Sequence, residues 1–334
     1  MFEALLLAAN IWTSDVPPIA AHGNYLNLDA PVGLDTWLSP DVWSIPIYTS
    51  SRHDTRRPLL YNPQAWTNVA AGKWLRSGNK PQVEQEILAT SSTAFPPPGN
   101  VFSSVSSQAW TLPASFNKTY LSGAGNASFY VGADASPATG PDGHMAVLQP
   151  DDTVLETYAT ITLSSGQIVA LSYSVSDLHS AGDGYQNGQT ASMLPSYLGV
   201  IDDTEIADGE IKHAMAITVP ARFLSPQIAY PAFAFDRNAL TETPPYSGSL
   251  PMGTRLAIPA DTALDGLLLK TSAGYAIAVA AHRYGFIVVD RGGEGFTLRV
   301  RRNSPKPVDE LHNVSPALQD DLRTIFAHLV ATPH

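Results

Sequence analysis

The stretch VLETYATITL-SSG-QIVALSYSV, residues 154–175, indicates the fold class of this chain. Residues 154–163 are rich in β-branched side chains and alternate in polarity, which is typical of a β-strand with two different faces. Residues 164–166, Ser-Ser-Gly, have the composition of a hairpin turn, and residues 167–175 predict the returning strand. The stretch therefore predicts an antiparallel hairpin inside a β-rich unit.

Further strands are predicted on both sides of this hairpin. Their ranges are 128–131, 144–148, 211–219, 254–258 and 286–290. Only two segments show apolar residues at helical spacing, and these are 271–284 and 317–329. The second follows a Ser-Pro pair typical of a helix start. With 24 glycines and 27 prolines we expect many turns. The predicted fold is mostly β, a β-sandwich or jelly roll with a few peripheral helices.

The chain is predicted to form one β-rich domain over residues 1–334, although its length also suits two domains. Residues 1–127 are predicted as a loop-rich, Trp-containing part packed on the core, because their first 60 residues are rich in Pro, Asp and Trp. Residues 128–300 are predicted as the core β region and residues 301–334 as the part with the C-terminal helix. No repeat at solenoid or propeller spacing is present.

Composition and charge exclude several classes of protein. Hydrophobic residues make up 44% and charged residues 15% of the chain, which argues against charge-driven disorder. The formal net charge of −11 argues against a nucleic-acid partner. The chain has no cysteine, which excludes thiolate metal sites, thiol nucleophiles and disulfides. Since no window reaches 18 apolar residues, no membrane span is predicted.

The N-terminal residues MFEALLLAANIW contain a short apolar run without the basic residues of a signal peptide, since the first Lys or Arg is Arg52. Two interpretations follow, namely a chain without a leader or an exported chain whose signal has been removed. We favour the second, and therefore expect a secreted or periplasmic protein.

Candidate chemistry lies on the strands around the hairpin. Glu156 and Tyr158 share one face of a predicted strand, and His144 begins the neighbouring strand, so these groups can converge. For Glu156 and His144 a functional and a structural role have equal weight. The adjoining turns contain aspartates that we interpret as ordinary turn formers, Asp142 and Asp152.

Two later segments carry further candidates. Asp177 follows the strand 167–175 and precedes a Gly-rich loop, a common position for a catalytic carboxylate. His213 lies on the apolar face of the strand 211–219, downstream of Glu205. His213 is therefore either a hydrogen-bonded core histidine or a group that projects into a pocket.

Several short motifs resemble a family of exported, largely uncharacterised bacterial β-rich proteins. The matching motifs are a D-G-H turn at 142–144, a G-x-I-x-H-A strand at 209–214, a P-x-G-x-R stretch at 251–255 and an R-Y-G helix end at 283–285. The resemblance covers most of residues 128–295 and implies one exported β-rich unit, without a firm activity. It singles out His144, Glu156, Glu205 and His213. After Asp177 this chain has GYQNG where the family has a Trp-containing segment, which bears on substrate specificity.

We expect an enzyme that cleaves a polysaccharide, with hydrolysis ahead of elimination. Glycoside hydrolysis needs one protonated and one ionised carboxyl group, roughly 5–10 Å apart. Glu156 and Asp177 are the best pair, with Asp151 or Glu205 as substitutes. The residues that would tune a pKa or bind a hydroxyl are His144 and His213.

Two alternatives stay open beside hydrolysis. A polysaccharide lyase would use His144, Tyr158 and His213 as base and acid, while Lys212 or Arg255 neutralises a uronate. The net charge of −11 weakens that alternative. A non-catalytic carbohydrate-binding or surface module is the other, because all six tryptophans lie before residue 111 and exposed indoles stack on sugar rings. The same tryptophans suit packing of long loops onto a sandwich.

The remaining expectations concern binding residues and metals. Residues predicted to bind the substrate are Tyr158, Asp151, Lys212, Arg255 and Trp43. No cofactor is predicted. A metal site of His144, His213 and a carboxylate ranks last, because the two histidines are too widely spaced to be diagnostic. A structural Ca²⁺ in the Asp/Gly loops has the candidate ligands Asp151, Asp152 and Asp183.

Overall fold

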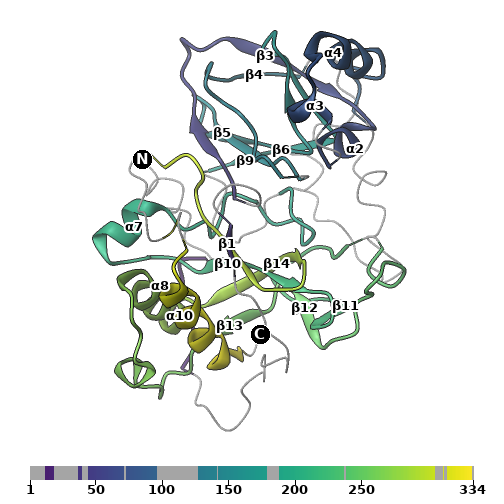
Figure 1. Ribbon diagram of the computed structural model, residues 1–334. Coiled ribbons are helices and arrows are strands. Elements are labelled where there is room, and N and C mark those ends of the chain that lie inside the picture. Colours follow the sequence, from purple (N-terminus) through teal and green to yellow (C-terminus); the bar gives the residue numbers. More distant parts are fainter. Residues whose placement is uncertain are drawn as a thin grey trace.

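The computed structural model describes residues 12–18, 37–39, 44–70, 73–95, 127–140, 142–178, 188–236, 238–304, 311 and 314–332. These residues form four β-sheets and a few helices, arranged in two lobes (Figure 1). We call residues 44–178 the N-terminal lobe, drawn at the top. Residues 188–332, with 12–18 and 37–39, form the C-terminal lobe below. The prediction of a mostly β fold with few helices is confirmed.

The N-terminal lobe contains two four-stranded sheets. The first has the order β2 (Ile47–Thr49), β5 (Met145–Leu148), β6 (Thr153–Tyr158), β9 (Ser172–Asp177). The second has the order β4 (Ser128–Tyr130), β3 (Arg56–Tyr61), β8 (Ile168–Ala170), β7 (Ile161–Thr162). Both sheets contribute side chains to one core, among them Leu59, Leu155, Ile168 and Tyr173.

The hairpin predicted at 154–175 is present, but it belongs to both of these sheets. Residues 161–162 pair with 168–169 in the second sheet, whereas residues 153–158 pair with 172–177 in the first. Each long predicted strand is broken into two, and Ala159, at the first break, has a φ of +50°. Since positive φ is unfavourable in a strand, the first chain segment leaves one sheet there and enters the other.

Strand β6 presents different residues to its two sides. Leu155 belongs to the core between the two sheets, whereas Val154 belongs to the core that continues into the C-terminal lobe. Alternation places Glu156 and Tyr158 on the same face as Val154. The strand therefore carries two polar side chains to the boundary between the lobes.

Three helices cover the outer face of the second sheet: α2 (Ala65–Ala70), α3 (Lys73–Arg76) and α4 (Lys80–Ala89). Trp74, Val83 and Ile87 pack there in a core shared with Ile161 and Val169. The prediction of only two helical segments is wrong for this region. Helix α4 buries only two apolar side chains, so its sequence has too weak a periodicity to be recognised.

The C-terminal lobe is built on a mixed six-stranded sheet. Its order is β1 (Trp37–Ser39), β15 (Thr297–Arg299), β10 (Met215–Pro220), β14 (Phe286–Gly292), β13 (Arg255–Ala257), β16 (Val330–Ala331). A parallel pair, β11 (Leu224–Ile228) and β12 (Leu250–Met252), stands beside it. The predicted strand 211–219 begins only at Met215, because residues 211–214 form a loop.

Both predicted helices are confirmed as α8 (Ser272–Arg283) and α10 (Pro316–Ala327). The Ser315 side chain caps α10 by accepting a hydrogen bond from the Leu318 N–H. The two helices pack together (Figure 1), and the ring of Phe326 lies 5.4 Å from Phe286 of the sheet. Two short helical elements, not predicted from the sequence, complete the lobe: α7 (Asp203–Asp208) and η1 (Leu264–Leu267).

Residues 12–18 bind to the C-terminal lobe. Trp12 is fully buried, and its carbonyl accepts a hydrogen bond from the Ala214 N–H. Gly199 has a φ of +69°, and a Cβ there would lie 2.4 Å from the Trp12 ring. Glycine is therefore required at this position for both conformation and space.

The finer predictions of the fold stand as follows. The two sheets of the N-terminal lobe face one core, but the described sheets are open and mixed and do not confirm a jelly roll. The single domain likewise stays a prediction. Among the described residues, every helix is too short or too polar to cross a membrane.

Candidate functional site

Three aspartates meet where the lobes join. Asp142 lies in the turn before β5, Asp236 between β11 and β12, and Asp290 on β14. All three are half-buried, and their negative charges act on one another's pKa values. Tyr158 of β6 donates a hydrogen bond to Asp142 at 3.3 Å. We call these four residues and Arg299 the acidic junction.

Asp290 is placed by an irregularity in the central sheet. Along the β10–β14 pair, Ile217 is opposite Val288 but Thr218 is opposite Asp290, so the register shifts by one residue at Val289. Such shifts bend a strand and redirect its side chains, often next to active sites. The Asp290 carboxylate accepts a hydrogen bond from Arg299 Nη2 at 2.8 Å, which makes an ion pair with little exposure to solvent.

Burial raises the pKa values of these carboxyl groups. Burial, and next the charge of Asp290, raise the pKa of Asp236 to about 6. Burial also raises the pKa of Asp290 to about 6, where Arg299 lowers it and Asp142 raises it. Two interacting carboxyls of this kind share protons as a pair, so near pH 6 one is protonated and the other ionised.

The other two groups of the junction are affected in the same direction. Burial raises the pKa of Asp142, although Arg299 and hydrogen bonds from Tyr158 and Trp66 lower it. Burial and the charges of Asp142 and Asp290 raise the pKa of Tyr158, so the phenol keeps its proton. Trp66 of α2 is 45% exposed, so an indole stands in solvent beside these acids.

Glu156 lies behind the junction and is fully buried. Its Oε2 accepts hydrogen bonds from the Gln189 N–H at 3.1 Å and from the N–H and hydroxyl of Ser196, both at 2.9 Å. Burial raises the pKa of Glu156 to about 7 in spite of these bonds. The side chain therefore fastens residues 189–196 of the C-terminal lobe to β6.

Buried polar atoms without a hydrogen-bond partner gather around Glu156. Within the part of the chain that the structure describes, they are His144 Nδ1, Glu156 Oε1, Ser174 Oγ, Gln189 Nε2, and Nε and Nη1 of Arg299. Burial and Arg299 lower the pKa of His144 well below its ordinary value, which leaves the ring neutral. Such atoms cost about 1–3 kcal/mol each and are rare outside functional sites.

His213 and Glu205 form a second, structural group. His213 Nε2 lies 3.0 Å from Glu205, and Nδ1 lies 2.9 Å from the Ala214 carbonyl. Burial lowers the pKa of His213, but the charge and hydrogen bonds of its neighbours outweigh burial and raise it. Glu205 also accepts from the Asp202 N–H and so completes the capping box of α7. This group precedes β10, at the opposite end of that strand from the junction.

The other predicted site residues are separate from the junction. Lys212 is exposed and pairs with Glu210 at 3.4 Å. Asp151 is exposed in a turn, where it accepts from the Thr153 hydroxyl. Arg255 is buried and donates to the Ser14 carbonyl at 2.9 Å, so it holds the N-terminal segment.

Some predicted positions lie at or beyond the limits of the described residues. The backbone of Asp177 ends β9, three residue pairs along the ladder from Glu156 and Ser174, but its side chain is not among the described groups. Trp43 and Asp183 lie outside the described residues. Of the predicted set, the structure brings together His144, Glu156 and Tyr158. No group of three His, Asp or Glu side chains that could hold a metal occurs among the described residues.

Four functional candidates were missed from the sequence. Asp142 was interpreted as a turn residue, and Asp236, Asp290 and Arg299 were not identified. A signal was present for Asp290, since it is a charged residue at the end of the apolar strand FIVVD, residues 286–290. The aspartates are distant in sequence and meet only when the lobes pack.

Comparisons with known proteins add no further guide to function. No family model, no curated protein and no solved structure matches this chain. The resemblance to the exported bacterial family thus stays a prediction, and the function has to be argued from the junction itself.

Proposed function

We propose that this chain is an enzyme that hydrolyses a glycosidic bond of a polysaccharide, with Asp236 and Asp290 as its carboxyl pair. The supporting observation is that these two half-buried carboxyls interact and both have a pKa near 6. The ion pair with Arg299 favours the anion on Asp290, so the shared proton resides on Asp236. One protonated and one ionised carboxyl group is what glycoside hydrolysis requires.

The surroundings of the pair suit a sugar. Trp66 offers an exposed indole for stacking against a sugar ring. Asp142 and Tyr158 supply a hydrogen-bond acceptor and a neutral donor for sugar hydroxyls. In this proposal Glu156 does not contact the substrate, because it is fully buried, and acts as a positioning residue for the segment 189–196. Export to the periplasm or medium remains part of the proposal.

Hydrolysis is favoured over elimination by the charges at the junction. A lyase needs a side chain that accepts a proton, but the neighbouring carboxylates raise the pKa of Tyr158 and make it a poor base. A uronate would also approach three aspartates, while Lys212 and Arg255 lie elsewhere. A neutral glycan fits better.

The test is a reducing-end assay on neutral and uronic polysaccharides, with the ultraviolet absorbance of unsaturated uronates followed in parallel. Asp236→Asn and Asp290→Asn should each lower the rate roughly 100-fold to 10,000-fold. Asp151→Asn is the matched control, because that aspartate is exposed in a turn, and it should leave the rate unchanged.

Three outcomes would contradict the proposal. Full activity in both junction variants, with loss in Asp177→Asn, would return the acid pair to the predicted β9 position. Rising absorbance would establish a lyase. Retention on a glycan affinity gel without any cleavage would establish a binding module.

A further inference from the structure

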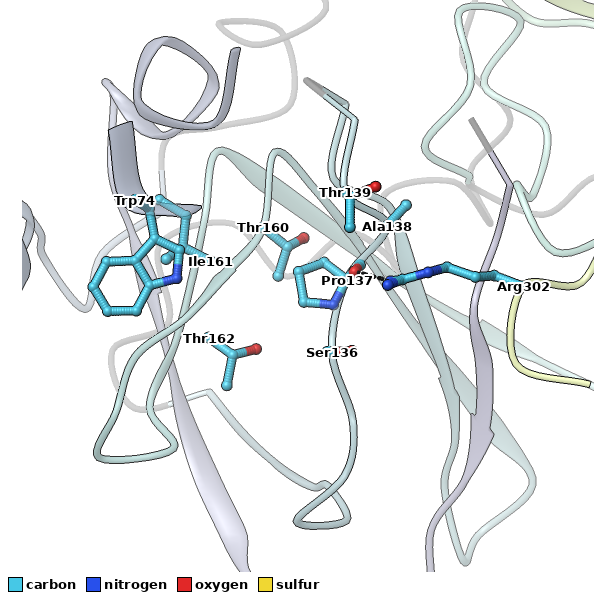
Figure 2. A pocket seen from close by; sticks show the side chains of 9 residues that line it. All are labelled: Trp74, Ser136, Pro137, Ala138, Thr139, Thr160, Ile161, Thr162 and Arg302. Atoms are coloured by element: carbon cyan, nitrogen blue, oxygen red, sulfur yellow. Dashed lines mark hydrogen bonds between the residues drawn. The ribbon is translucent and has the colours of Figure 1, made fainter. Parts of the chain in front are cut away.

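A pocket of about 180 Å³ lies in the N-terminal lobe, on the far side of the turn that carries Asp142 and His144. Figure 2 shows its walls, which come from α3, from β7 and the residue before it, from residues 136–139, and from the chain after β15. The lining side chains are Trp74, Ser136, Pro137, Ala138, Thr139, Thr160, Ile161, Thr162 and Arg302.

The pocket has mainly apolar walls and a size suited to one small ring. Trp74, Ala138 and Ile161 are buried hydrophobic residues. Arg302 Nη1 donates to the Pro137 carbonyl at 2.6 Å and ties residues 136–139 to the end of β15. An apolar cavity of roughly 150 Å³ in another protein is known to accept benzene, so one substituted ring fits here.

Two polar groups in the pocket have no partner among the described residues. One is Thr162 Oγ1, which is inaccessible to solvent and forms no hydrogen bond. The other is the indole N–H of Trp74, whose nitrogen lies on the side of the ring that faces Thr162 (Figure 2). Lys80 Nζ lies 5.1 Å from the centre of the Trp74 ring and interacts with its face, which leaves the N–H edge for the pocket.

The other hydroxyls of the pocket are already engaged. Thr160 donates to Thr157 at 2.7 Å, and the Ser136 hydroxyl lies 3.4 Å from that of Tyr48. A sugar ring, with a hydroxyl on most of its carbons, would find too few partners. A ring with one hydroxyl meets one N–H donor and one threonine hydroxyl.

We propose that this pocket binds a phenol, that is, a single aromatic ring that carries a hydroxyl group. The phenol oxygen accepts from the Trp74 N–H, and its O–H donates to Thr162 Oγ1. The Ala138 N–H donates to the His144 carbonyl, and the Thr160 N–H to the Gly143 carbonyl. The ligand therefore touches residues that hold the Asp142 turn in place. The proposal does not depend on the glycosidase function.

The experiment compares phenol with toluene, two probes of nearly equal size, by isothermal titration calorimetry on the full chain. Phenol should bind more tightly than toluene. Thr162→Val keeps the shape of the side chain and removes its hydroxyl, so it should weaken phenol binding about threefold to tenfold and leave toluene unchanged.

Ala138→Leu is the second variant and fills the pocket, so it should abolish binding of both probes; circular dichroism checks that both variants fold. Absence of saturable phenol binding to the unmodified chain would overturn the proposal. Equal phenol affinity in Thr162→Val, or binding that survives in Ala138→Leu, would do so as well.

Discussion

Replacing Glu156 by glutamine tests how strongly the core between the lobes responds to pH. The amide can accept through its carbonyl oxygen the hydrogen bonds that Gln189 and Ser196 now donate to the carboxyl group. The variant therefore keeps the contacts that join residues 189–196 to β6. What it removes is the capacity to ionise.

The magnitude follows from the pKa. Burial raises the pKa of Glu156 from 4.5 to about 7, and each pKa unit corresponds to about 1.4 kcal/mol, which gives about 3 kcal/mol. Between these two values the unfolded chain has lost the proton while the folded chain keeps it, so the free energy of unfolding falls as the pH rises. Above pH 7 the full loss has occurred. The glutamine variant is spared this loss.

The assay is urea unfolding followed by circular dichroism at several pH values from 4.5 to 8, at constant ionic strength. The stability of Glu156→Gln relative to the unmodified chain should rise by about 3 kcal/mol over this range. Other titrating groups are shared by both proteins and cancel in the difference. Glu210→Gln is the control, because Glu210 is exposed, and its difference should stay within about 0.5 kcal/mol at every pH. A difference for Glu156→Gln that is constant, or that falls with pH, would refute the reasoning.

Two further predictions use the same unfolding measurement. Gly199→Ala should cost more than about 3 kcal/mol, because its Cβ meets both the Trp12 ring and the Ala216 backbone, whereas Gly209→Ala, with a similar φ and open space, should cost about 1 kcal/mol; equal costs would show that residues 12–18 do not pack as described. His213→Gln should cost about 3 kcal/mol below pH 6.5, and that cost should shrink as the pH rises through the raised pKa of His213, since the ion pair with Glu205 is then lost; a cost that grows with pH would contradict the assignment.

The strands could be predicted where alternation is strong, and the sheets to which they belong could not. Residues 154–163 read as one strand because Ala159 has no unusual side chain, yet its positive φ divides them between two sheets. Helix α10 was predicted because Ser315, Pro316 and a clear apolar face agree with one another. Helix α4 has a cap but only two buried apolar residues, so local pattern was too weak there.

The candidate site was predicted in part for a related reason. His144, Glu156 and Tyr158 lie within 15 residues of one another on neighbouring strands, so alternation alone brings them together. Asp236, Asp290 and Arg299 enter through the packing of a second lobe, which short-range pattern does not reveal. His213 stood out as a polar residue on an apolar strand, but its neighbours are the cap of α7 and the Ala214 carbonyl.

The pairing of β1 with β15 has a consequence for synthesis. Residues 37–39 find their partners only at residues 297–299, and the Ile47 N–H waits for the side chain of Asn303, 256 residues later. At about 5–20 residues per second, the ribosome needs roughly 13–50 s to supply those partners. During that interval the early strand has an unpaired edge in the growing chain, open to association with other nascent chains. Slower translation would lengthen this exposure, and a chaperone that binds extended segments would have its target near the N-terminus.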